Sequence, residues 1–154
     1  MNFQTNKKDG FTIIEVVLVL AIAGLIFLMV FLALPALQRN QRDTQRKTDA
    51  SQAISQLQNY ASSKRGNIPS SSDGFASFWA SYMKETKSPS GGAYDVLSEL
   101  RADPGTDEVS YSGRGYVCND GEGDGVFVYV TPANNRQAAI AIGLENGTHC
   151  LNLQ

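Results

Sequence analysis

The feature that most constrains the fold of this chain is an apolar run from Phe11 to about Leu37 that contains one ionisable residue, Glu15. About twenty consecutive apolar residues in a helix suffice to cross the roughly 30 Å hydrocarbon core of a membrane. A charged side chain at the centre of such a helix costs about 2.5–3.5 kcal/mol on insertion, and less towards the ends. The run therefore predicts a transmembrane helix, and its carboxylate predicts a specific partner.

The remainder of the chain is polar. With 154 residues in total, the chain has room for one small domain beyond the helix. The formal net charge of −2 indicates no basic surface for nucleic acid. We therefore expect a small extramembrane domain that is rich in Ser, Gly, Asn and Gln.

The two cysteines, Cys118 and Cys150, both lie near the C-terminus. An even number of cysteines in a domain beyond a membrane segment favours one disulfide in an oxidising compartment. The alternative is two independent buried thiols in a reducing compartment. In the chain-entropy account, a disulfide that closes a loop of this length contributes about 3–4 kcal/mol.

Residues 7–15, with the sequence KKDGFTIIE, closely resemble the processing site of type IV prepilins and pseudopilins. In that family a short basic leader stays in the cytoplasm, and a dedicated membrane peptidase removes it after the glycine. The resemblance implies that residues 1–10 are the leader and that Gly10 is its last residue. It also implies that Phe11 becomes the N-methylated N-terminus and that Glu15 is the glutamate used in assembly.

Positive charges lie at both ends of the apolar run. Two precede it and four follow it: Lys7 and Lys8, then Arg39, Arg42, Arg46 and Lys47. A count of these charges alone would place the C-terminal end in the cytoplasm. The processing motif favours the opposite orientation, because cleavage requires Gly10 on the cytoplasmic side.

Cleavage would give Phe11 a free amine, which stays cationic after one methylation. Glu15 can then pair with this amine in its own chain or in a neighbouring subunit. Removing one partner of a buried ion pair costs about 3–5 kcal/mol, so the pairing would penalise a subunit that enters out of register. The alternative is an ordinary membrane anchor whose glutamate reaches the lipid headgroups.

The helix is expected to continue beyond the membrane as an amphipathic segment over residues 38–66. Apolar residues recur there at three- and four-residue spacing: Ala50, Ala53, Ile54, Leu57, Tyr60 and Ala61. Gly66 and Pro69 indicate its end, and Pro35 is expected to bend or locally open it.

Residues 67–108 are predicted to connect the helix to a sheet through short helices. A first short helix carries an aromatic stripe, with Ser72 or Asp73 as its N-cap. The stripe consists of Phe75, Phe78, Trp79, Tyr82 and Met83. We expect it to pack on the core rather than to form a ligand platform. A second short helix is predicted around residues 94–100.

Residues 109–154 are predicted to form an antiparallel sheet of three or four strands. The strand-like segments are 109–118, 126–131, 138–144 and 149–153. The pair Asn146-Gly147 favours a type I′ turn before the last strand. The fold class is therefore α+β, a long N-terminal helix packed against a small sheet, and the family resemblance implies the same layout. It also implies that a disulfide between Cys118 and Cys150 staples the C-terminal region.

Three acidic residues that alternate with glycines, Asp120, Glu122 and Asp124, form a weak candidate for a calcium site. The segment lacks the twelve-residue EF-hand pattern, so a solvated acidic loop is the preferred interpretation. The lone His149 beside Cys150 does not complete a structural zinc site. We find no catalytic constellation and predict that the chain is not an enzyme and needs no cofactor.

The leading hypothesis is a type IV pilin, a structural subunit that polymerises through its N-terminal helix into a pilus for adhesion, twitching motility or DNA uptake. The alternatives are a pseudopilin of a type II secretion system or competence pseudopilus, and a membrane-anchored ligand-binding module. The resemblance implies other pilin subunits, a prepilin peptidase and methyltransferase, an assembly platform with its ATPase, and membrane lipids as partners. It places the precursor in the inner membrane and the assembled subunit in an extracellular filament.

Overall fold

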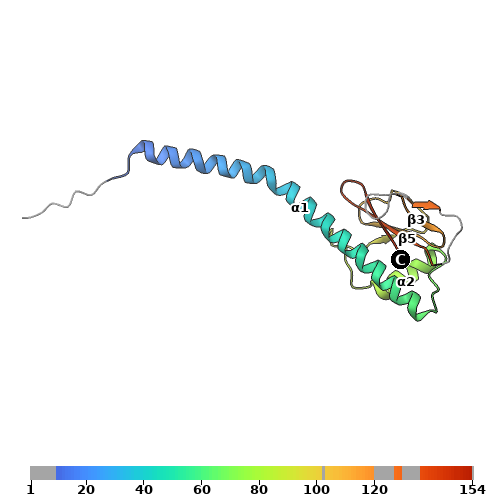
Figure 1. Cartoon of the computed structure of the whole chain (residues 1–154). Helices are drawn as coiled ribbons and strands as arrows, with labels where there is room; N and C mark the ends of the chain where they lie inside the picture. Colours follow the sequence, from blue (N-terminus) through green and yellow to red (C-terminus); the bar gives the residue numbers. More distant parts are fainter. Residues whose placement is uncertain (1–9, 102, 120–126, 130–135, 154) are drawn as a thin grey trace, which may run out of the picture. The chain divides into compact units, whose positions relative to one another are not determined.

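The computed structural model describes residues 10–101, 103–119, 127–129 and 136–153. The chain divides into two compact units, Met1–Gln38 and Arg39–Gln154, and each is described by itself. Helix α1 (Ile13–Ser63) begins in the first unit and continues into the second (Figure 1). Every residue of the first unit from Ile13 onward belongs to this helix.

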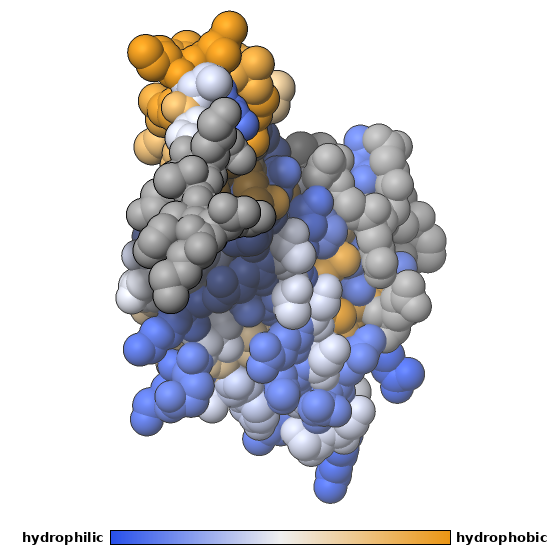
Figure 2. Space-filling model, turned by 90° about the vertical axis from the view of Figure 1, so that its left-hand side faces the viewer, coloured by the Kyte–Doolittle hydropathy of each residue, from blue (hydrophilic) through white to orange (hydrophobic). Residues whose placement is uncertain are grey.

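The first unit is apolar on all sides. Over its described residues the large apolar side chains are all exposed, from 44% at Leu34 to 86% at Phe11, and orange predominates at this end of the molecule in Figure 2. Among the described residues, α1 is the one helix that is long and apolar enough to cross a membrane. Pro35 lies inside α1 and does not end it. The bend or local opening expected at Pro35 stays a prediction, since a proline removes one backbone hydrogen bond from the helix.

The second unit contains the predicted amphipathic part of α1. Ala50, Ala53, Ile54 and Leu57 are buried in its core, which confirms the predicted apolar face. Tyr60 and Ala61 are partly buried against the same core and belong to the same stripe.

Helix α2 (Ser72–Tyr82) follows a short connection and carries the aromatic stripe. Its N-cap is Ser71, whose Oγ accepts a hydrogen bond from the backbone N–H of Gly74 at 3.2 Å. The predicted cap at Ser72 or Asp73 is therefore wrong, because Ser71 is the residue that has the extended backbone of an N-cap (φ −141°, ψ 165°).

The stripe on α2 packs into the core, as predicted. Phe75, Phe78, Trp79 and Met83 are buried, whereas Tyr82 is 43% exposed. The ring of Phe75 stacks on that of Tyr111 with centroids 4.2 Å apart. These contacts leave no aromatic platform for a ligand on the buried side of α2.

A four-stranded sheet forms the other side of the core, with strand order β1-β2-β5-β6. The strands are β1 (Asp95–Val96), β2 (Glu108–Ser112), β5 (Ala139–Gly143) and β6 (Thr148–Asn152). β1 runs parallel to β2, and the other two pairings are antiparallel, so the sheet is mixed rather than antiparallel throughout.

The helix predicted around residues 94–100 is wrong, because β1 lies there. The N–H of Asp95 donates to the carbonyl of Asp107 at 3.0 Å, and the N–H of Leu97 donates to that of Val109 at 2.9 Å. These tertiary hydrogen bonds outweigh the local helical spacing.

The segment predicted as one strand over residues 109–118 is two strands in different sheets. After β2, Gly115 adopts a positive φ of 93°, and the chain then enters β3 (Tyr116–Cys118). β3 pairs with β4 (Phe127–Tyr129) in a separate antiparallel ribbon. The turn at Gly115 thus leads the chain out of the main sheet and into this second ribbon.

The turn between β5 and β6 differs in type from the prediction. All of its residues are described, and of these Gly147 alone has a positive φ, of 93°. A type I′ turn needs positive φ at both central residues, so the type I′ prediction is wrong. A single left-handed glycine fits a type I turn followed by a bulge.

An arginine that the sequence patterns did not single out is fully buried on α1. Arg46 donates from Nε to Asp107 at 2.8 Å and from Nη1 to Asp43 at 2.9 Å, and Nη1 lies 3.7 Å from Glu145. Arg42 also pairs with Glu145, at 3.3 Å. Two of the four positive charges that follow the apolar run are therefore neutralised by acids of the folded domain.

The charges around Arg46 hold the loops of Asp107 and Glu145 against α1, and Asp107 in turn binds the loop of Ser88 and Ser90. Burial alone would lower the pKa of Arg46, but Asp107 and Asp43 outweigh it and raise that pKa above its ordinary value. Burial also opposes the charge on Asp107, yet hydrogen bonds from Ser88 and Ser90 and the pairing with Arg46 keep the pKa of that carboxyl below its usual range. The same acid has a left-handed backbone, with φ of 67°.

A second buried polar contact lies one turn further along α1. The hydroxyl of Tyr94 donates to Asp49 at 2.7 Å. Burial raises the pKa of the Asp49 carboxyl, and this hydrogen bond only partly offsets the effect. The first turns of α1 in the second unit are thus attached by polar contacts, and apolar packing begins at Ala50.

Candidate functional site

The predicted processing residues lie immediately before α1. Gly10 and Phe11 are both exposed, and a Cβ added to Gly10 would have no other atom within 4 Å. Packing within this chain therefore does not require glycine at position 10. Residues 1–9, the rest of the predicted leader, lie outside the described residues.

Glu15 occupies the first turn of α1, where its carboxylate contacts Thr12. Its Oε2 accepts from the backbone N–H of Thr12 at 3.5 Å and from the Thr12 hydroxyl at 3.3 Å. In return, the Thr12 Oγ1 accepts from the backbone N–H of Glu15 at 3.4 Å. This reciprocal arrangement is a capping box, with Thr12 as the N-cap.

Thr12 is a residue of this site that the sequence analysis missed. The available signal was the spacing Thr-x-x-Glu at the start of the apolar run, which is the capping-box pattern. The pattern explains why α1 begins at Ile13. An acidic side chain in the first turn also interacts favourably with the helix dipole.

The surface beside Glu15 is apolar. A shallow recess of about 280 Å³ is lined by Phe11, Glu15, Val16, Val19 and Leu20. A single carboxylate in such a surface is chemically suited to a cationic group that reaches it from an apolar environment. The structure thus brings together Phe11 and Glu15, the two residues that the sequence analysis assigned to the mature N-terminus.

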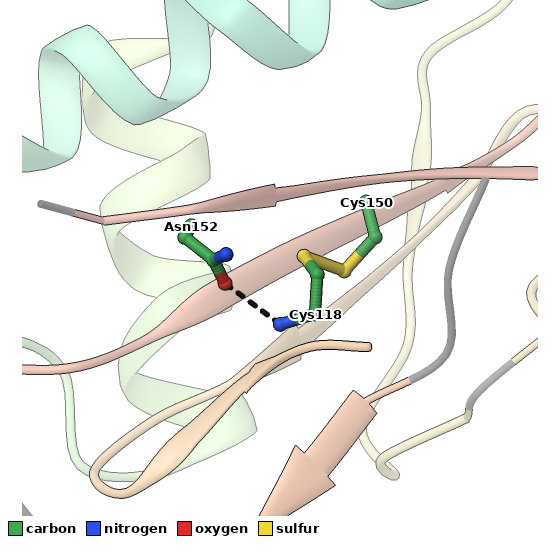
Figure 3. Close-up of a disulfide and its surroundings, with 3 residues drawn as sticks. All are labelled: Cys118, Cys150 and Asn152. Carbon is green, nitrogen blue, oxygen red and sulfur yellow. Dashed lines mark hydrogen bonds between the residues drawn. A yellow bond between two sulfur atoms is a disulfide. The ribbon is translucent and has the colours of Figure 1, made fainter. Parts of the chain in front are cut away.

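Cys118 and Cys150 are joined by a disulfide, with an S–S distance of 2.10 Å and Cα atoms 5.7 Å apart (Figure 3). Beside it, the backbone N–H of Cys118 donates to Oδ1 of Asn152 at 2.7 Å. The disulfide ties the β3–β4 ribbon to β6 and lies among buried small residues, including Ala139 and Ala141. It therefore fixes the ribbon on the sheet face that is turned away from the main core.

The calcium candidates Asp120, Glu122 and Asp124 lie outside the described residues. Within the described ranges, no group of three or more His, Cys, Asp or Glu side chains could hold a metal ion. Because the disulfide uses both sulfurs, a site that combined them with His149 would lack its thiolate ligands.

Comparison with known proteins gives one family match. Residues 5–31 match the family model of the prokaryotic N-terminal methylation motif. The matched segment includes Gly10, Phe11, Thr12 and Glu15. No curated protein and no solved structure matches the chain significantly.

Proposed function

We propose that this chain, which carries the N-terminal methylation motif shared by type IV pilins and pseudopilins, is a structural subunit that polymerises into a cell-surface pilus. The observation that carries the proposal is an exposed apolar helix that starts at this motif. The motif implies processing by a prepilin peptidase and polymerisation with other pilins. The motif and the apolar helix also fit a membrane-anchored precursor.

The apolar surface of the first unit supports polymerisation. An α-helix that is apolar all round needs an apolar environment on every side. Lipid supplies that environment for the precursor, and the equivalent helices of other subunits supply it in a filament.

Processing prepares the helix for assembly. Hydrolysis of the peptide bond between Gly10 and Phe11 leaves a carboxylate on Gly10 and an amine on Phe11, which is then methylated. Glu15 lies one helical turn away and pairs with the amine of its own chain or of a neighbour. This pairing sets the register of the incoming subunit, because an unpaired buried charge costs about 3–5 kcal/mol.

Each segment then has a distinct task. Residues 1–10 are the leader, 11–37 anchor and assemble the subunit, and 38–66 carry the domain. Residues 67–108 and 109–154 form the folded domain that the filament exposes. The disulfide between Cys118 and Cys150 stabilises this exposed domain in an oxidising environment.

The experiment is to shear surface filaments from cells that express the full chain and to compare Glu15→Val with Ile14→Val as the matched control. Ile14 is also exposed on α1, at 75%, but it is apolar. Filaments that contain the wild-type and Ile14→Val chains, but not Glu15→Val, support the proposal. A wild-type chain that stays monomeric in the membrane contradicts it and favours a membrane-anchored binding module, whereas short envelope-confined assemblies indicate a pseudopilin.

A further inference from the structure

Glu15 lacks its proposed ionic partner before processing. In the uncleaved chain Phe11 is joined to Gly10 through an amide, so it has no amine. A carboxylate in an apolar helix without a partner is costly. The precursor therefore needs another way to satisfy Glu15 until cleavage.

Thr12 of the same chain provides hydrogen bonds to the Glu15 carboxylate. Its backbone N–H and its hydroxyl both donate to Glu15, and its hydroxyl oxygen also accepts from the Glu15 N–H. Both donations end on Oε2. Oε1 of Glu15 is thus left for a different partner. Glu15 itself lines the apolar recess.

We propose that Thr12 is a positioning residue for Glu15, holding Oε2 in the precursor and presenting Oε1 to the amine that cleavage creates. This inference rests on the proposed function, since it concerns the step in which a processed subunit joins a filament. The hydroxyl of Thr12 is required as both donor and acceptor. A side chain of the same shape without a hydroxyl keeps only the backbone N–H as a donor to Oε2, so Glu15 rotates more freely and enters the filament in the wrong orientation more often.

Two substitutions separate the hydroxyl from the shape of the side chain. Thr12→Val keeps the branched shape and removes the hydroxyl, whereas Thr12→Ser keeps the hydroxyl and removes a methyl group. Ile13→Val serves as the matched control, because Ile13 is the next residue and its side chain is 85% exposed.

The test is a competition in cells that express the full-length wild-type chain together with one variant. Mass spectrometry measures the variant-to-wild-type ratio in sheared filaments and divides it by the same ratio in the processed membrane pool. We expect the quotient to fall about tenfold for Thr12→Val, equivalent to about 1.4 kcal/mol. We expect a quotient near one for Thr12→Ser and for Ile13→Val. In a Glu15→Gln background, Thr12→Val should lower the residual incorporation no further.

The outcomes separate this inference from the function on which it rests. If wild-type filaments form and Thr12→Val enters them as readily as the wild type, the positioning role is wrong and the pilin proposal stands. If Thr12→Val is depleted equally in the processed pool and in the filament, Thr12 acts in cleavage or helix stability instead, which also overturns the inference. If the wild-type chain forms no filaments, the proposed function itself fails.

Discussion

The buried ion cluster around Arg46 gives the sharpest prediction about the folded domain. Arg46 is 0% exposed and contacts three carboxylates, those of Asp43, Asp107 and Glu145. Arg46→Met keeps an unbranched, largely apolar side chain but leaves Asp43 and Asp107 without this cation, whereas Glu145 keeps its pairing with Arg42. Breaking a buried ion pair in this way costs about 3–5 kcal/mol.

The magnitude translates into a large change in melting temperature. For a domain slightly larger than 100 residues, 1 kcal/mol corresponds to about 4 °C, so Arg46→Met should lower the melting temperature by about 12 °C or more. The assay is thermal unfolding of the full chain in detergent, followed by circular dichroism at pH 7. Because α1 in the first unit remains helical in detergent, the near-ultraviolet signal of the packed aromatic residues is the appropriate probe.

Arg101 provides the matched control. It pairs with Glu108 at 2.9 Å, nearly the same separation as in the Arg46 pairs, but its side chain is 57% exposed. Exposed ion pairs contribute about 0–1 kcal/mol, so Arg101→Met should shift the melting temperature by only a few degrees. The reasoning is refuted if the two substitutions destabilise the domain equally.

Three further predictions concern the same domain. Folding lowers the pKa of Asp107, so the ionised carboxylate stabilises the domain fully at pH values above its unfolded pKa of about 3.9. That stabilisation is lost as the pH falls. Asp107→Asn should therefore flatten the decline in the free energy of unfolding between about pH 5 and pH 2. Replacing Cys118 and its disulfide partner with serine should lower the free energy of unfolding in urea by about 3–4 kcal/mol, and an unchanged midpoint would count against a stabilising disulfide. Gly143→Ala should destabilise the domain by about 3 kcal/mol in the same assay, because the new Cβ would overlap the carbonyl oxygen of Gly105, whereas Gly92→Ala, with open space around it, should be nearly neutral.

The parts of the fold that were predictable from sequence are those governed by local patterns. The apolar run and the stripe from Ala50 to Leu57 identify the two parts of α1, since helical periodicity is a property of neighbouring residues. β5 and β6 were predicted within about one residue at each end because a glycine turn separates two strongly patterned strands. Sequence motifs also predict the processing residues and the assembly role of Glu15, and this segment matches the family model of the N-terminal methylation motif.

The missed features depend on residues that are distant in the sequence. β1 is a strand only because β2 offers it backbone partners, and its own residues do not alternate long enough to indicate a strand. In the sequence Arg46 is one of four positive charges that follow the apolar run, and its partners Asp107 and Glu145 lie 61 and 99 residues away. Thr12 is the one missed residue whose partner is close in the sequence, since the Thr-x-x-Glu spacing already indicates its capping box with Glu15.

The central claim is that this chain is processed and then polymerised, and the most direct test is the mass of its N-terminal peptide in sheared surface filaments. The account predicts a peptide that begins at Phe11, carries one methyl group on its amine and lacks residues 1–10. A chain that retains Met1 and is found only in the membrane would contradict the account.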